Sequence, residues 1–407
     1  MSNIPKLRFP EFTDAWEKCK LGKIAIKVTE KNKDGIFQET LTNSAEFGVI
    51  SQRDFFDKDI SNPENLNGYY IVKPNDFVYN PRISNLAPVG PIKRNQLNRI
   101  GIMSPLYFIF RVSSNIDLDF LDAFFSTNLW HLFLKLNGDS GARADRIAIK
   151  DKIFMEMPIS IPTLPEQQKI GNLFKQLDWL ITLHKRKWDD VILLKKALLQ
   201  KMFPKNGSDF PEIRFPEFTD AWEKCKLGEV AKQAYGGGTP STLIKEFWNG
   251  SIAWIQSSDL KIDEIFPVIA KKFISKTALE KSATKLIPAN SIAIVTRVGV
   301  GKLAVMSDKY TTSQDFISLS NIQGDTFFIA YSLYSILKKE SNQAQGTSIK
   351  GITKVELLNK TLYLPTLPEQ QKIGNLFKQL DRLITLHKRQ HEHYQLLKKA
   401  LLQQMFV

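Results

Sequence analysis

The sequence predicts a mixed α+β fold, in which two globular domains are joined to two long helices that pair antiparallel as a coiled coil. Three observations predict it. Two blocks of sequence each occur twice, dissimilar regions of similar length lie between the copies, and one repeated block has a heptad pattern of apolar residues. The whole chain is therefore expected to be a tandem repeat with pseudo-two-fold symmetry.

The repeated blocks are long and nearly identical. RFPEFTDAWEKCKLG occupies residues 8–22 and recurs unchanged at 214–228, and TLPEQQKIGNLFKQLD occupies 163–178 and recurs at 366–381. The regions between the blocks share no obvious sequence. A gene duplication without functional content would explain the copies alone, but similar ends around dissimilar middles favour a constant frame that presents two different recognition surfaces.

These blocks predict the domain boundaries. The first globular domain is expected at 1–162, the first conserved helix at 163–203, a linker at 204–210, the second globular domain at 211–365 and the second conserved helix at 366–407. The linker sequence, PKNGSDF, is rich in residues that favour turns.

The apolar residues of the second block follow alternating steps of three and four. The predicted helix-pairing seam consists of Ile170, Leu173, Leu177, Leu180, Val191, Leu194 and Leu198 in the first helix and of Ile373, Leu376, Leu380, Leu383, Tyr394, Leu397 and Leu401 in the second. His184 and Lys187 interrupt the first seam, and Phe174, Ile181 and Trp188 widen it. A Leu-Pro pair sets each helix start, and about 35 residues give a length of about 50 Å. The alternative is that each helix packs only on its own globular domain.

The regions between the blocks predict strands followed by a helix. In the first domain strands are expected near Val49, at 76–80 and at 105–112, with a helix at 118–136. In the second, strands are expected at 251–256, 291–298 and 316–320, with a helix at 327–339. This order favours a mixed α+β domain in each half.

Polar loops rich in glycine and basic residues connect these elements. Arginine, lysine, amide and hydroxyl side chains are the groups that contact phosphates and base edges. The candidate DNA-contacting residues are Asn80, Arg82, Asn85, Lys93, Arg94, Ser140, Arg143, Arg146, Thr239, Ser241, Ser257, Ser258, Thr296, Arg297, Lys302, Gln314, Thr347, Ser348 and Lys350. For any single loop, a solvated turn is at least as good an interpretation.

Composition and charge narrow the class of protein. Lysine and arginine total 56 against 42 aspartate and glutamate residues, a net charge of +14 that suggests a polyanionic partner such as nucleic acid. No apolar run approaches the roughly 18 residues of a membrane span, and the start has no apolar segment typical of a secretory signal. Only Cys19 and Cys225 occur, which excludes a disulfide framework and favours the cytoplasm.

No convincing catalytic motif is present. GVGK at 299–302 lacks the first glycine of a phosphate-binding loop and is better interpreted as a hairpin turn. His387, His391 and His393 lack a further ligand, so no metal site is expected. The chain also lacks a serine triad, a Cys-His pair, a nuclease carboxylate cluster and the (N/D)-P-P-(F/Y) tetrapeptide of adenine methyltransferases.

Several motifs resemble those of one family. GGGTPST with EFWNGSIAWIQSSDL, TSQDF, and GTSIKGITKVEL leading into LPTLPEQQKI resemble the specificity (S) subunit of type I restriction-modification systems. In the first half YNPRISNLAPVG, GIMSPLYFIF and PTLPEQQKI match more loosely. The resemblance extends over essentially the whole chain.

That resemblance implies a function and partners. It implies two target recognition domains that each read one half of a bipartite, asymmetric DNA site, and two helices that serve as spacer and docking surface. Two modification (M) subunits, which bind S-adenosylmethionine and methylate adenine at N6, would dock there, and motor-nuclease (R) subunits would add ATP- and Mg-dependent cleavage. The chain itself would be non-catalytic and hold no cofactor. A stand-alone, repressor-like DNA-binding protein and a helical assembly scaffold remain as alternatives.

Overall fold

The computed structural model describes residues 3–57, 63–139, 145–205, 207–297, 299–343 and 351–407. The chain divides into two compact units: unit 1 is Met1–Thr182 with His391–Val407, and unit 2 is Leu183–Gln390. Each unit combines one globular domain with segments of both long helices. The domain boundaries stated above remain a prediction.

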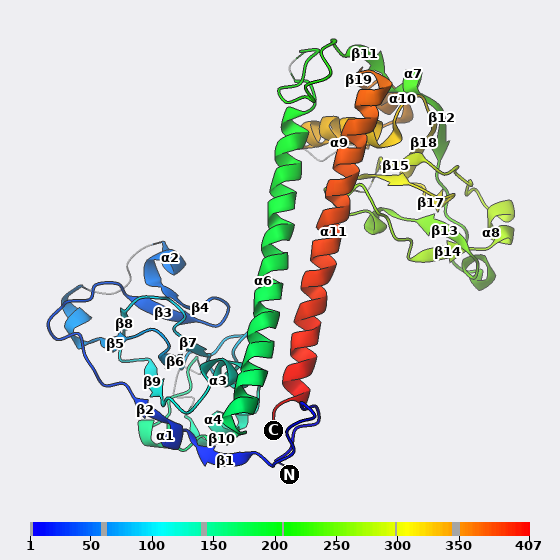
Figure 1. Cartoon of the computed structure of the whole chain (residues 1–407). Coiled ribbons are helices and arrows are strands. Elements are labelled where there is room, and N and C mark those ends of the chain that lie inside the picture. Colours follow the sequence, from blue (N-terminus) through cyan, green and yellow to red (C-terminus); the bar gives the residue numbers. More distant parts are fainter. Residues whose placement is uncertain (1–2, 58–62, 140–144, 206, 298, 344–350) are drawn as a thin grey trace. The chain divides into compact units, whose positions relative to one another are not determined.

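Two helices of equal length dominate the chain (Figure 1): α6 (Leu164–Lys201) and α11 (Leu367–Gln404), with 38 residues each. Both begin at the Leu-Pro pair, as predicted. In unit 1, Nζ of Lys398 in α11 donates to Asp178 in α6 at 2.5 Å. In unit 2, Nζ of Lys195 in α6 donates to Asp381 in α11 at 2.5 Å. Within each unit the two segments therefore run antiparallel.

The less exposed residues of both helices include one row, in alternating steps of three and four, that differs from the prediction. In α6 and the residue after it, this row is Ile170, Phe174, Leu177, Ile181, His184, Trp188, Val191, Lys195, Leu198 and Met202. In α11 and the residue after it, the row is Ile373, Phe377, Leu380, Ile384, His387, His391, Tyr394, Lys398, Leu401 and Met405. Asp381, which is 0% exposed, lies beside this row. The predicted row of Leu173, Leu180 and Leu194 lies one residue away.

The predicted seam is therefore partly wrong. Leu194, Leu383 and Leu397 are 49%, 40% and 36% exposed, and Leu173, Leu180 and Leu376 are only half-buried. The physical reason is that large aromatic side chains and the aliphatic stems of two lysines fill the row that the leucines were expected to fill. The alternative interpretation is also partly right, because Ile170 and Leu177 belong to the globular core of unit 1 and Ile373 and Leu380 to that of unit 2.

The main sheet of unit 1 has four antiparallel strands in the order β2-β9-β6-β7. Its remaining strands form three pairs, β1 with β10, β3 with β4 and β5 with β8. The bounds are β1 Glu17–Lys20, β2 Ala25–Lys27, β3 Leu41–Ser44, β4 Gly48–Ser51, β5 Tyr70–Val72, β6 Phe77–Tyr79, β7 Ile92–Arg94, β8 Gly101–Met103, β9 Phe108–Val112 and β10 Pro158–Ile161. The short helices are α1 Leu21–Ile24, α2 Gln52–Phe56, η1 Pro63–Gly68, α3 Leu118–Phe125, α4 His131–Asn137 and α5 Asp151–Phe154.

One helix expected in unit 1 is two helices. The predicted segment 118–136 breaks between α3 and α4, so the prediction of a single helix is wrong. The Thr127 hydroxyl donates to the Phe124 carbonyl at 2.7 Å, and the Leu129 amide donates to the Thr127 hydroxyl oxygen at 3.3 Å. Side-chain bonds of this kind compete with the helical backbone and end the helix.

The main sheet of unit 2 also has four strands, in the order β12-β18-β15-β16. A second sheet has the order β14-β13-β17, and β11 pairs with β19. The strands are β11 Glu223–Lys226, β12 Ala231–Gly236, β13 Ile252–Ile255, β14 Lys272–Ile274, β15 Ser291–Val295, β16 Leu303–Met306, β17 Thr311–Thr312, β18 Phe316–Ile322 and β19 Thr361–Leu364. The helices are α7 Leu227–Val230, η2 Lys245–Trp248, η3 Ser257–Asp259, α8 Lys276–Lys281, α9 Thr326–Gln343 and α10 Lys354–Leu358.

The two main sheets have the same topology although their sequences differ. The pairings β2–β9, β9–β6 and β6–β7 correspond to β12–β18, β18–β15 and β15–β16, and all are antiparallel. The turn 80–91 in unit 1 is thus topologically equivalent to the turn 296–302 in unit 2. The hairpin expected at GVGK is confirmed, because β15 and β16 flank it.

The repeated blocks anchor each long helix to its domain in the same way. Nε and Nη2 of Arg8 donate to the carboxylate of Glu166, at 2.7 and 2.8 Å, in the first turn of α6. Arg214 and Glu369 repeat this contact in unit 2 with the same distances. Both glutamates are fully buried, so these charge-assisted, two-point contacts fix where each helix begins on its domain.

Candidate nucleic-acid interface

In unit 1 two of the predicted polar loops lie side by side. The Ile83 amide donates to the Asp145 carbonyl at 3.0 Å, and the Ile147 amide donates to the Pro81 carbonyl at 2.9 Å. Arg82 and Arg146 face each other in an isolated antiparallel bridge. The loops around 80–85 and 145–147 therefore present two arginines from neighbouring backbone segments.

The turn between β6 and β7 depends on a glycine and on an amide side chain. Gly90 has a φ of +80°, and a Cβ there would lie 2.0 Å from the Asn80 carbonyl oxygen, so only glycine fits. The side chain of Asn80 donates to the Asn43 carbonyl at 2.8 Å and accepts from the Arg82 amide at 3.0 Å. Asn80 therefore shapes the loop that carries Arg82.

In unit 2 the equivalent turn also gathers several predicted loops. The Thr296 amide donates to the Asp315 carbonyl at 2.8 Å, and the Ile352 amide donates to the Thr296 carbonyl at 2.8 Å. Nζ of Lys302 donates to the carbonyls of Leu260 at 3.2 Å and Ser257 at 3.4 Å. Three segments therefore meet around one turn: TRVGVGK, TSQDF and SSDLK. Ile352, just before α10, joins them there.

The glycine-rich segment of unit 2 joins this group. The Gly238 amide donates to the Thr312 carbonyl at 2.9 Å, next to TSQDF. A Cβ at Gly237 would lie 1.8 Å from the Ser313 carbonyl oxygen, so the two backbones approach too closely for any other residue. We call the described segments of these loops the candidate interface: 80–85 and 145–147 in unit 1, and 237–242, 257–261, 296–302 (without 298) and 312–316 in unit 2.

The candidate residues divide by what their side chains contact. The exposed ones, suited to an external ligand, are Arg82, Asn85, Thr239, Ser241, Ser258, Arg297 and Gln314, and Arg146 and Ser257 are half-exposed. Thr296 is buried, and its hydroxyl donates to the Asp315 carbonyl at 3.2 Å. With Asn80 and Lys302, Thr296 holds the loops together, and contact of these three residues with DNA stays a prediction.

Two further candidates lie away from these loops. Lys93 and Arg94 belong to β7, and Arg94, whose side chain is 11% exposed, forms ion pairs with Asp119 and, at 3.5 Å, with Asp122 of α3. Burial lowers the pKa of Lys93, and Asp122 and Asp178 oppose that shift. The prediction that both residues lie in a loop is wrong, because they belong to β7, where the carboxylates of α3 engage Arg94 and the half-buried Lys93 lies near Asp122. Their contact with DNA stays a prediction.

Comparisons with known proteins show what the chain is similar to. Residues 219–393 match the family model described as the type I restriction modification DNA specificity domain. A type I restriction enzyme specificity subunit, MjaVIII, from Methanocaldococcus jannaschii is 26% identical over 97% of this chain and 92% of its own length. The chain is thus similar to type I restriction-modification specificity subunits.

Other specificity subunits are similar to this chain as well. The MjaIX specificity subunit of the same organism is 28% identical over 49% of this chain and 47% of its own length, so the chain spans about half the length of this relative. The crystal structure of the type I S subunit from M. genitalium has a TM-score of 0.59 at 13% identity and covers 99% of both chains. It supports the fold alone. The interpretation as a non-catalytic specificity subunit agrees with these relatives.

Five candidate residues lie outside the described residues: Ser140, Arg143, Thr347, Ser348 and Lys350. Within the described ranges, no three His, Cys, Asp or Glu side chains are grouped closely enough to hold a metal ion. Nor is any helix of that described part long and apolar enough to cross a membrane.

One basic surface of unit 2 was not predicted from the sequence. Lys245, Lys271, Lys272 and Trp248 line a hollow of 550 Å³ whose lining contains no acidic residue. The Trp248 indole N–H donates to the Ser241 carbonyl at 3.1 Å, which connects this hollow to the candidate interface. The motif EFWNGSIAW contains Trp248 and could have pointed to this surface, but the lysines at 271–272 are distant in sequence.

Proposed function

We propose that this chain is the sequence-specific DNA-binding specificity subunit of a type I restriction-modification complex, and that it recognises a bipartite, asymmetric site. One observation carries the proposal. Two sheets of the same topology present equivalent loops with unrelated sequences, Asn80–Asn85 in unit 1 and Thr296–Lys302 in unit 2. A shared scaffold with different exposed side chains suits two domains that read different bases.

The charge distribution supports DNA as the ligand. The net charge is +14, and the exposed Arg82 and Arg297 occupy the two equivalent turns. Arginine binds guanine through two parallel hydrogen bonds and also binds phosphates, so one arginine in each turn can contribute either to base reading or to positioning.

The long helices offer surfaces for two partner copies. Leu193 and Leu194 in unit 2 are 63% and 49% exposed, and the equivalent Leu396 and Leu397 in unit 1 are 68% and 36% exposed. Repeated exposed apolar pairs fit two modification subunits that would bind in the same way. Those subunits would bind S-adenosylmethionine and methylate adenine at N6, and restriction subunits would use ATP and Mg.

Domain exchange tests this function. The chain, produced together with a modification subunit, should direct methylation of adenine at N6 within a two-part sequence, mapped by single-molecule sequencing. Replacing residues 23–162 by the equivalent region of a relative should change one half of that sequence only. Changes in both halves would contradict the proposal. Purification without a partner, with tight sequence-specific binding, would instead favour a stand-alone DNA-binding protein.

A further inference from the structure

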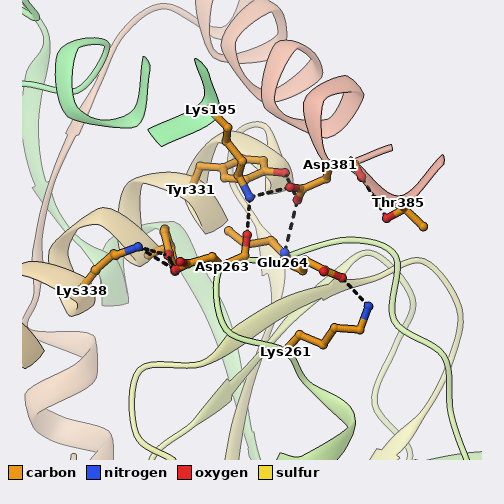
Figure 2. A network of polar contacts seen from close by, with 10 residues as sticks. Lys195, Lys261, Asp263, Glu264, Tyr331, Lys338, Asp381 and Thr385 are labelled. Carbon is orange, nitrogen blue, oxygen red and sulfur yellow. Dashed lines mark hydrogen bonds and ion pairs between the residues drawn. The ribbon is translucent and has the colours of Figure 1, made fainter. Parts of the chain in front are cut away.

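Unit 2 contains a buried charged pair, in which Lys195 occupies a seam position where a coiled coil normally has an apolar residue and Asp381 lies beside the seam of α11. The side chains of Lys195 in α6 and Asp381 in α11 are 4% and 0% exposed. Nζ of Lys195 donates to Asp381 Oδ1 at 2.5 Å, and the Tyr331 hydroxyl of α9 donates to Asp381 Oδ2 at 2.6 Å (Figure 2). The pair therefore connects three helices within this unit.

The same pair holds a loop of the globular domain. Nζ of Lys195 also donates to the Asp263 carbonyl at 2.6 Å, and the Ile265 amide donates to Asp381 Oδ2 at 3.2 Å. The carboxylate of Asp263 in turn accepts from Lys338 of α9 at 2.7 Å and from the Tyr334 hydroxyl (Figure 2). The Asp263 carbonyl and the Ile265 amide of the loop are thus hydrogen-bonded directly to the charged pair.

This loop continues directly from the candidate interface. Ser257, Ser258 and Lys261 precede Asp263 by a few residues, and Lys302 of the equivalent turn binds the carbonyls of Ser257 and Leu260. Phe266, at the other end, lies 5.5 Å from Nζ of Lys378 and 5.8 Å from the guanidinium carbon of Arg382, both in α11. The segment 257–266 is therefore held between the helices and the turn that carries Arg297.

The equivalent pair in unit 1 is different. Asp178 and Lys398 occupy the same positions of the repeat, but their side chains are 54% and 21% exposed. If this Lys–Asp pair only held the two helices together, it should be equally buried in both units. Burial only in unit 2 points to a role specific to that unit.

We propose that Lys195 and Asp381 are positioning residues that fix segment 257–266, and thereby the base discrimination of unit 2, from the helix seam. This inference rests on the proposed function. Burying an ion pair costs desolvation, so such a pair contributes little to stability compared with apolar residues of similar size, but it favours one arrangement of the groups it joins. Here that arrangement includes the backbone of the loop.

The double variant Lys195→Met with Asp381→Leu tests the proposal, and Asp178→Leu with Lys398→Met is the matched control in unit 1. We expect the melting temperature of the first variant to stay within a few degrees of the wild type. Amide exchange at Ile265 should rise at least tenfold. Methylation should lose at least tenfold in discrimination against base changes in the half-site of unit 2 and keep its discrimination in the other half-site. Lys195→Arg should retain most of both properties.

Two outcomes would overturn the proposal. One is unchanged protection of Ile265 in the double variant, and the other is unchanged discrimination at the half-site of unit 2 although Ile265 exchanges faster. If the double variant does not fold, Lys195→Arg and Tyr331→Phe are measured instead. Equal protection of the Ile265 amide from exchange in these two variants would contradict the proposal. If the wild-type chain binds no DNA specifically, the proposed function is wrong. Amide exchange at Ile265 would still show whether the Lys195–Asp381 pair holds the loop.

Discussion

At the scale of single residues, two arginines with the same predicted role have different surroundings in the fold. Arg94 is bound to the carboxylates of Asp119 and Asp122 on α3, whereas Arg297 is exposed in the turn between β15 and β16. Arg94 is the last residue of β7, Arg297 follows β15, and both were predicted to contact DNA. The charge of Arg94 is already compensated inside unit 1, so only Arg297 presents its charge to an external polyanion.

This difference predicts opposite effects of alanine substitution. Arg297→Ala should reduce the slope of log K against log salt by about one unit if it contacts phosphate, or cost about 1–3 kcal/mol at one base pair if it reads a base. Arg94→Ala should leave the salt dependence unchanged and destabilise unit 1 by about 1–3 kcal/mol, because Asp119 and Asp122 each lose one of their partners. Filter binding at several salt concentrations and urea unfolding measure the two effects. A reduced salt slope for Arg94→Ala alone would contradict the assignment.

Residue types alone could not separate these roles. Asn80, Thr296 and Lys302 carry donors and acceptors suited to DNA, yet their side chains bind carbonyls of neighbouring loops. Those carbonyls come from segments distant in sequence, such as Asn43 and Leu260, so the pairing becomes visible only in the folded chain. The sequence did place Arg82, Asn85 and Arg297 in exposed loops, because glycine and proline mark the turns there.

At the scale of elements, the repeat and the helix starts were predictable, and the exact seam was not. Leu-Pro-Glu begins both helices as expected, since proline is tolerated in the first turn. The seam assignment failed at Leu194 because leucine is more apolar than Lys195, its neighbour. Burial of Lys195 depends on Asp381 and on the Asp263 carbonyl, neither of which a heptad pattern identifies.

The corrected seam predicts unequal effects of one chemical change. Leu177→Ala removes a side chain that is 5% exposed and lies in the core of unit 1, so it should cost about 2–5 kcal/mol. Leu194→Ala removes a 49% exposed side chain and should change stability by less than about 0.5 kcal/mol. Urea denaturation measures both. Equal losses of stability at the two positions would support the seam predicted from the sequence instead.

At the scale of the whole molecule, two domains without obvious sequence similarity share one strand order. The order β2-β9-β6-β7 matches β12-β18-β15-β16 because short apolar runs at similar spacing specify strands, while the exposed loops carry no constraint from the core. The sequence predicted mixed α+β domains from these runs. It could not predict that the turns at 80–91 and 296–302 are equivalent, since this depends on which strands pair.

The repeat of the helices predicts how the chain sets the distance between its half-sites. Each helix has 38 residues and a seam with strict steps of three and four, so inserting seven residues after Arg186 and another seven after Arg389 preserves the seam. Each helix should lengthen by about 10 Å, which corresponds to about three base pairs at 3.4 Å each.

If the helices act as the spacer, methylation mapping of this doubly extended variant should find the same two half-sites with a longer unread segment between them. The rotation of DNA over three base pairs turns one half-site away from its domain, so reduced activity is expected as well. Insertion into one helix alone is the control, because it shifts the two seams relative to each other and should abolish assembly. An active, doubly extended variant that keeps the original spacing would mean that these helices do not set the distance, and the spacing would then have to come from the domains or from the partner subunits.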